Sequence, residues 1–115
     1  MKKEIFYKNY LFNDTGARAL VKSEGYKRIY FNDAGEKIIV FYEKNGHQYN
    51  ITEESTGYSI PATGATIKEA EANLLKIIDA VFSQFKTDFF KNAQKDHARM
   101  LRAGIFRDLT GYIKI

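Results

Sequence analysis

One turn-forming segment occurs twice in the chain, and this repeat most constrains how the first half folds. The segment reads Phe-Asn-Asp-x-Gly and occupies residues 12–16 and, 19 positions later, residues 31–35. Asn, Asp and Gly tolerate positive φ angles and bond to nearby backbone, so each copy predicts a tight turn between two strands. A basic residue and an apolar triplet follow each copy, as is typical of the start of a strand.

Two further turn signals divide the rest of the first half. An Asn-Gly dipeptide at 45–46 is a strong hairpin signal, and Ser-Thr-Gly at 55–57 indicates a fourth turn. Together the turns predict an antiparallel meander of five or six short strands over residues 4–60. Residues 17–22 fit either a strand or a helical turn. Pro61 is expected to end the last strand, because proline has no N–H group for a sheet ladder.

The region from residue 66 to residue 103 has a helical pattern and contains neither Gly nor Pro. Thr66 and Glu69 form a capping box, which predicts that a helix begins at Thr66. Apolar residues then recur at the spacing of a helix that lies on a sheet, at Ile67, Ala70, Leu74, Ile77, Ile78, Val81, Phe82 and Phe85. The pattern allows one long helix, or two consecutive helices if Thr87 caps a second one. Gly104 is the expected C-cap.

These patterns predict one α+β domain over residues 1–115, with the meander sheet packed against the helical region. The chain is 44% hydrophobic and 28% charged, which is typical of a folded globular protein. The last residues, 105–115, have strand-like content and are expected to dock on a sheet edge. There is no cysteine, no signal peptide at the start and no apolar run that approaches a membrane span, so we expect a cytoplasmic protein.

Positive charge is concentrated near the end of the chain. The whole sequence has a net charge of +4, and residues 86–107 contain six Lys or Arg residues against Asp88 and Asp96. Four of these cations are expected on one face of a helix, because they fall within roughly 80° of arc at 100° per residue: Lys91, Lys95, Arg99 and Arg102. Such a face is either ordinary solvated helix surface or a contact for phosphates or an acidic protein.

A second candidate surface combines tyrosines with cations in the first half. Tyr26, Arg28 and Tyr30 are the residues we select from it, because aromatic rings and cations together can stack on bases and hold phosphates. The alternative for these tyrosines is ordinary cross-strand packing within the sheet.

The sequence offers little that suggests catalysis. It has only two histidines, and it lacks the convergent ligands or nucleophile motifs that metal sites and hydrolases require. Residues 14–17, Asp-Thr-Gly-Ala, resemble the active-site motif of retroviral-type aspartic proteases. However, Asn13 stands where that family has an apolar residue, and the helical second half does not fit its nearly all-β fold. We therefore expect no catalytic residue, no metal and no cofactor.

Part of the chain resembles a known antitoxin family. Residues 37–78 are predicted to run strand, hairpin, strand, turn, short strand and helix, and the helix entry reads Gly64-Ala65-Thr66-x-x-Glu69-Ala70. This order and this entry are similar to the N-terminal domain of HicB-type antitoxins. The resemblance implies a sheet-plus-helix fold, and it implies an antitoxin or oligomeric interaction protein as one candidate function.

The composition as a whole resembles small accessory proteins of phages and mobile elements, among them anti-CRISPR proteins. The chain is compact, rich in Lys, Asn, Ile and Tyr, and has no enzyme signature. The leading hypothesis is a non-enzymatic binding protein that occupies a partner surface, most concretely an inhibitor of a CRISPR nuclease or of its guide-RNA complex. The alternatives are direct nucleic-acid binding by the basic helix face and a HicB-like oligomeric protein. A homodimer is left open, and no membrane partner is expected.

Overall fold

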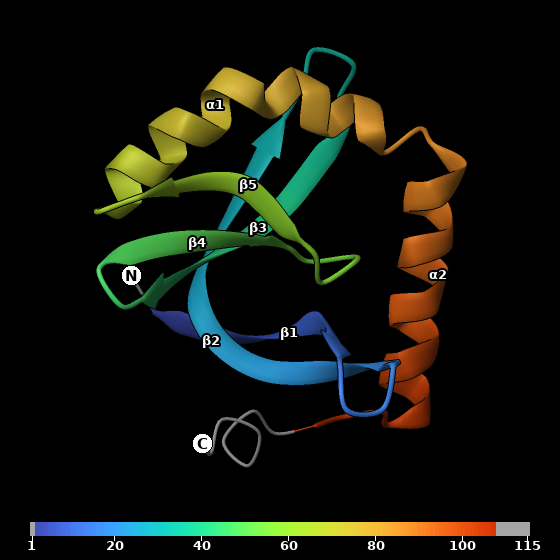
Figure 1. Ribbon diagram of the computed structural model, residues 1–115. Helices are drawn as coiled ribbons and strands as arrows, with labels where there is room; N and C mark the ends of the chain where they lie inside the picture. Colours follow the sequence, from blue (N-terminus) through green and yellow to red (C-terminus); the bar gives the residue numbers. More distant parts are fainter. Residues whose placement is uncertain (1, 108–115) are drawn as a thin grey trace.

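The computed structural model describes residues 2–107 and has an α+β architecture (Figure 1). Its elements in chain order are β1 (Lys3–Phe12), β2 (Ala17–Phe31), β3 (Lys37–Asn45), β4 (Gln48–Glu53), β5 (Ser59–Gly64), α1 (Ile67–Gln84) and α2 (Asp88–Ala103). The strands form one open antiparallel sheet in the order β1-β2-β3-β4-β5. The predicted meander and the α+β class are therefore confirmed.

The glycine-containing turns lie where the sequence predicts them. Both Phe-Asn-Asp-x-Gly copies connect neighbouring strands, and Gly16 and Gly35 have φ angles of +69° and +81°. The third turn is centred one residue later than the Asn-Gly dipeptide indicates, since Asn45 pairs with Gln48 across a Gly46–His47 loop. In that loop only Gly46 has positive φ, which is the pattern of a type II′ hairpin.

The second strand is longer than expected, which leaves five strands and not six. β2 runs without interruption over 15 residues, so residues 17–22 are strand and not a helical turn. Its first part pairs with β1 and its last part with β3, and Gly25 lies next to the change of partner. A Cβ atom at Gly25 would be 2.6 Å from the backbone oxygen of Tyr42. The missing side chain therefore lets the strands approach closely at this point.

The last strand continues through Pro61, contrary to the expectation that it ends there. β5 is at the edge of the sheet, where one side of the strand needs no ladder partner. The β4–β5 register also shifts next to Pro61, because Ile51 pairs with Ile60 whereas Asn50 pairs with Thr63. The irregularity accommodates the missing N–H group.

Helix α1 lies across β4 and β5 and buries the predicted apolar stripe (Figure 1). Thr66 caps the helix as predicted, since its Oγ1 accepts a hydrogen bond from the Glu69 N–H group at 3.1 Å. The Glu69 carboxylate reaches back one residue beyond the N-cap and accepts a hydrogen bond from the Ala65 N–H group. The main core combines this helix with the sheet and contains Ile38, Val40, Tyr42, Ile51, Ile60, Ala62, Ala70, Leu74 and Phe82.

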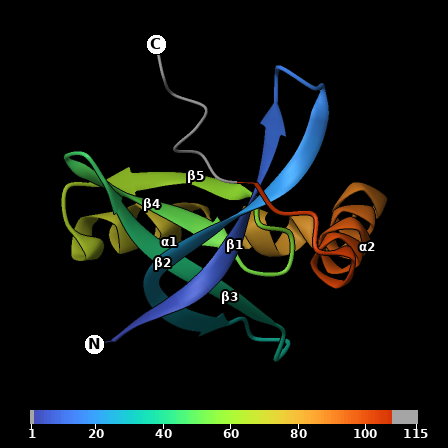
Figure 2. The same ribbon diagram turned by 90° about the horizontal axis from the view of Figure 1, so that it is seen from below.

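The helical half consists of two helices, which decides between the two alternatives that the sequence allows. Thr87 caps α2 by accepting a hydrogen bond from the Phe90 N–H group at 3.2 Å. After this break α2 turns away from α1 and runs along one end of the sheet (Figures 1 and 2). Gly104 ends α2 in the left-handed conformation, as expected.

The segment after α2 docks on a sheet edge. Leu20 of β2 donates its N–H to the Ile105 oxygen and accepts from the Arg107 N–H, both at 2.9 Å. This is the edge of β2 that β3 does not cover. The expectation of edge docking is thus met for residues 105–107, and the rest of the predicted tail, 108–115, lies outside the described residues.

Candidate interaction surface

The basic face predicted on the second helix is present on α2. The side chains of Lys91, Lys95, Arg99 and Arg102 are all exposed, and we call this set the basic stripe. Within residues 2–107, the only ion pair of the stripe joins Arg99 to Asp96, at a long 3.9 Å between two solvent-exposed groups. Such a pair contributes little, so the described residues leave most of the charge of the stripe unneutralised.

The opposite side of α2 is only partly buried. Ala93, His97 and Met100 pack against the rest of the domain, as expected of the apolar side. Phe89, however, is 70% exposed and Leu101 is 38% exposed. The helix therefore touches the sheet along a narrow strip, and apolar surface remains accessible beside that strip.

Helix α2 packs against the β4–β5 turn. Glu53 is only 4% exposed, and its carboxylate accepts hydrogen bonds from the N–H and hydroxyl groups of both Ser55 and Thr56, at 2.7–2.9 Å. Gln94 of α2 then donates its amide to the Ser55 hydroxyl at 2.9 Å. A buried carboxylate with this many donors holds the turn in one conformation and ties the helix to it.

His97 reaches the same turn from α2 and is buried. It is 5% exposed, and its Nδ1 atom has no hydrogen-bond partner among the described residues. Burial lowers the pKa of His97 below its usual 6.5, although a backbone hydrogen bond with Thr56 and the charge of Glu54 act in the opposite direction. The imidazole is therefore neutral near pH 7, with an unused polar atom. The exposed His47 lies in the β3–β4 loop, away from this contact.

Gly57 makes this close contact sterically feasible. Its φ angle is +71°, and a Cβ atom there would be 2.7 Å from the Tyr7 oxygen and 2.9 Å from Cε1 of His97. The Gly57 oxygen also accepts a hydrogen bond from the Asn9 N–H group of β1 at 2.9 Å. The turn thus joins β1 to α2, two elements that are far apart in the sequence.

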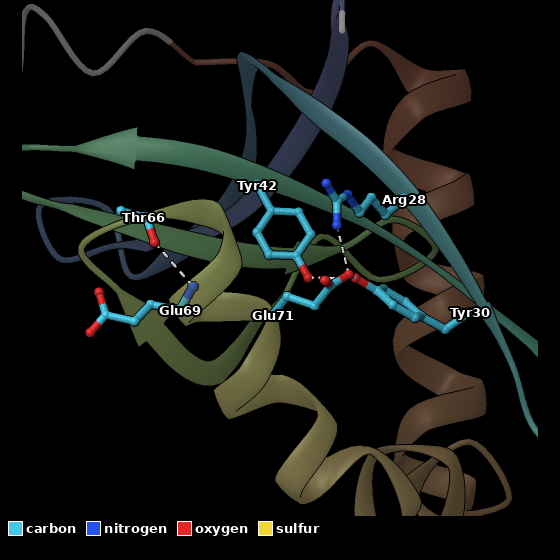
Figure 3. A network of polar contacts seen from close by, with 6 residues as sticks. All are labelled: Arg28, Tyr30, Tyr42, Thr66, Glu69 and Glu71. Atoms are coloured by element: carbon cyan, nitrogen blue, oxygen red, sulfur yellow. Dashed lines mark hydrogen bonds and ion pairs between the residues drawn. The ribbon is translucent and has the colours of Figure 1, made fainter.

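Two residues of the second candidate surface belong to an internal polar network (Figure 3). Arg28 donates to the Glu71 carboxylate of α1 at 2.7 Å, and Tyr30 donates to the same oxygen at 2.5 Å. The Tyr42 hydroxyl lies 2.6 Å from that of Tyr30. Burial, helped by the hydrogen bond to Glu71, raises the pKa of Tyr30, while the bonds from Tyr30 and Arg28 lower the pKa of Glu71.

The structure places the predicted site residues in different surroundings. The basic stripe faces solvent on α2, whereas Arg28 and Tyr30 hold the sheet against α1. Tyr26 lies opposite Tyr42 in the sheet and packs against the main core, with the Lys3 ammonium 5.9 Å from its ring centre. The tyrosines of β2 therefore do not form a joint surface with the basic stripe.

Sequence reasoning did not find the buried carboxylate of Glu53 or its link to α2. The sequence predicts the Ser-Thr-Gly turn. The available signal for the buried carboxylate was the Glu two residues before this turn, because Ser and Thr hydroxyls can donate hydrogen bonds to a nearby carboxylate. The bond from Gln94 had no local signal, because Ser55 is 39 residues away.

Comparison of the chain with family models, with curated proteins and with solved structures finds no match. In the part of the chain that the structure describes, no three His, Asp or Glu side chains lie close enough together to hold a metal ion. Neither α1 nor α2 has the length and apolar character needed to cross a membrane.

Proposed function

We propose that this protein is a non-enzymatic binding protein that occupies an acidic surface of a partner protein through α2. The observation that carries the proposal is the basic stripe, with four exposed cations and one weak internal ion pair. Lys91 and Arg102 are eleven residues apart, so the stripe extends over about 16 Å at 1.5 Å per residue. A row of this length suits an extended acidic surface better than a single small anion.

The most concrete form of the proposal is an inhibitor of a CRISPR nuclease, of the kind that phages and mobile elements encode. Such an inhibitor needs no catalytic group, since it acts by covering a surface that the nuclease uses. Exposed ion pairs contribute only about 0.2–1 kcal/mol each. The stripe therefore speeds and orients the encounter, and further contacts must supply much of the affinity.

Charge reversal tests this function. The variant K91E/K95E/R99E/R102E removes the stripe, and K37E/K44E/K68E/K76E makes the same change at four exposed lysines elsewhere. We expect the first variant to lose at least tenfold in affinity for a co-occurring CRISPR nuclease and to lose inhibition, while the control retains both. Calorimetry and a DNA-cleavage assay measure the two effects. Binding by neither the wild type nor the control would exclude the nuclease as the partner.

Nucleic acid is the second candidate partner of the same stripe. It is favoured because four cations line one helix face, and among the described residues only Arg99 is paired, with Asp96. Direct phosphate binding by four cations predicts a log–log salt slope of about −4 with duplex DNA. A pull-down from host lysate with and without nuclease treatment separates the candidates, because a protein partner is retained after the nucleic acid is digested.

A further inference from the structure

A groove runs between the outer edge of β1 and α2. It has a volume of about 480 Å³, and its lining includes Ile5 and Tyr7 from β1, Ser55 from the β4–β5 turn, and Ala98 and Leu101 from α2. β1 is at the end of the sheet, so none of the other described strands pairs with its outer edge. Figure 1 shows α2 running along the end of the sheet where this groove lies.

The strand side of the groove carries unsatisfied backbone groups. Leu20 directs its N–H and C=O groups away from β1, so its partner Asn9 directs its own groups to the outer edge. Ile5 and Tyr7 have the same orientation because the groups alternate along a strand. The β4–β5 turn pairs with this edge at Asn9 and lies against the Tyr7 oxygen, since a Cβ atom on Gly57 would be 2.7 Å from it. The described turns, loops and caps provide no hydrogen bond to Ile5 or to the Tyr7 N–H group. This edge is a template for one more strand.

The helix side of the groove supplies apolar contacts and a polar floor. Ile5 is 49% exposed and Leu101 is 38% exposed, and both line the groove together with the small side chain of Ala98. Gln94 and His97 lie deeper in the lining, and Nδ1 of His97 is the buried polar atom without a partner. A strand edge beside a helix, with apolar walls and spare polar groups, is the arrangement by which strand-addition sites bind peptides.

Charge decides which peptide suits the groove. Ala98 in the groove wall is a helical neighbour of two stripe residues, because Lys95 lies three residues before it and Arg102 four residues after it. The outer rim is therefore basic. The rest of the groove is mixed in charge, because Glu54 lies in its lining and β1 carries Glu4 beside Lys3 and Lys8, with Lys8 paired to Glu43 at 2.9 Å. The charge preference of the groove is therefore set by the stripe at its rim. An acidic strand from another protein complements this rim.

We propose that this groove binds an extended acidic peptide segment of a partner protein, which adds as a strand to the outer edge of β1. Its backbone pairs with Ile5 and with the Tyr7 N–H group, its inward side chains fill the space beside Leu101, and its carboxylates reach the basic stripe. This inference rests on the proposed function, since it names the kind of segment that α2 binds.

Selection from a phage-displayed library of random twelve-residue peptides tests the groove. The groove variant is A98W, in which the indole fills the space between β1 and α2, and the matched control is A103W, at an exposed alanine of α2 outside the groove lining. We expect the wild type and A103W to enrich acidic peptides, and A98W to bind those peptides at least tenfold more weakly. Hydrogen exchange of the Ile5 and Tyr7 amides should slow when a selected peptide binds.

Three results would overturn the groove proposal. They are failure of the wild type to enrich any peptide, equal peptide binding by A98W and the wild type, and unchanged exchange at Ile5 and Tyr7 in the bound state. Failure of the broader function looks different, because the K91E/K95E/R99E/R102E variant would then bind the partner as well as the wild type does. If the stripe variant loses the partner and A98W does not, α2 binds an acidic surface and the groove is not involved.

Discussion

At the scale of single residues, glycines have distinct roles that the sequence does not separate. Gly16 and Gly57 both lie in turns and both have φ near +70°. Nothing lies within 4 Å of a Cβ atom placed on Gly16, whereas one on Gly57 would overlap β1 and His97. The first glycine serves only the turn, and the second also allows three elements to meet.

Substitution of these two glycines by alanine should separate the roles. G16A is expected to lose about 1 kcal/mol in free energy of unfolding, the cost of a left-handed backbone for a residue with a Cβ atom. G57A adds a steric overlap with backbone atoms that cannot move easily, so we expect a loss of at least about 3 kcal/mol. Urea denaturation of both variants measures the difference. Equal losses would show that the residues around Gly57 rearrange without a further loss in free energy of unfolding.

At the scale of the elements, the β4–β5 turn determines where α2 sits. Its internal bonds centre on Glu53, and its bonds outward reach β1 through Gly57 and α2 through Gln94. The helix itself has few buried side chains, namely Ala93, His97 and Met100. The position of α2, and with it the basic stripe and the groove, therefore depends on this turn.

Removal of the Glu53 carboxylate should loosen α2. E53A leaves the buried N–H and hydroxyl of Thr56 and the half-buried N–H and hydroxyl of Ser55 without their acceptor, and we expect a loss of about 3 kcal/mol in free energy of unfolding. E54A is the matched control, because Glu54 is the next residue and its side chain is only half-buried. We expect this control to change stability by less than about 1 kcal/mol. Hydrogen exchange across α2 should rise in E53A alone, and unchanged exchange would contradict the role given to the turn.

At the scale of the whole molecule, the β1–β2 hairpin, the β4–β5 turn and α2 meet around His97. The imidazole is buried where these parts come together, and burial lowers its pKa below 6.5. The unfolded chain takes up a proton on this histidine near pH 6.5, but the folded chain does so only at lower pH. The stability of the domain is therefore complete above about pH 6.5 and falls as the pH drops from there to the folded pKa.

The pH dependence of unfolding should identify His97 as the responsible group. We expect the free energy of unfolding of the wild type to fall between pH 7 and pH 5, by at most about 1.4 kcal/mol per pH unit from this one group. H97Q should be less stable at pH 7 but should lack this part of the decline. H47Q, at the exposed histidine, should follow the wild type. Matching pH profiles for the wild type and H97Q would contradict the assignment.

How much of the fold could be predicted depends on how local its causes are. The turns at Gly16, Gly35 and Gly57 and the cap at Thr66 can be predicted, because each depends on residues within a few positions of one another. The cap at Thr87 was one of two alternatives that the sequence allowed. The continuity of β2 and the passage of β5 through Pro61 were missed. Both depend on partners that are distant in sequence, namely the close approach of Tyr42 and the register shift against β4.

The features of the candidate site were predictable to the same extent, according to how local their causes are. The sequence alone determined that Lys91, Lys95, Arg99 and Arg102 share one face of a helix, because helical periodicity fixes the direction of each side chain. Only the tertiary structure decided that this face stays open to solvent, that Arg28 and Tyr30 are engaged with Glu71, and that the helix borders the unpaired edge of β1. These outcomes depend on the packing of elements up to about ninety residues apart, for which local periodicity carries no information.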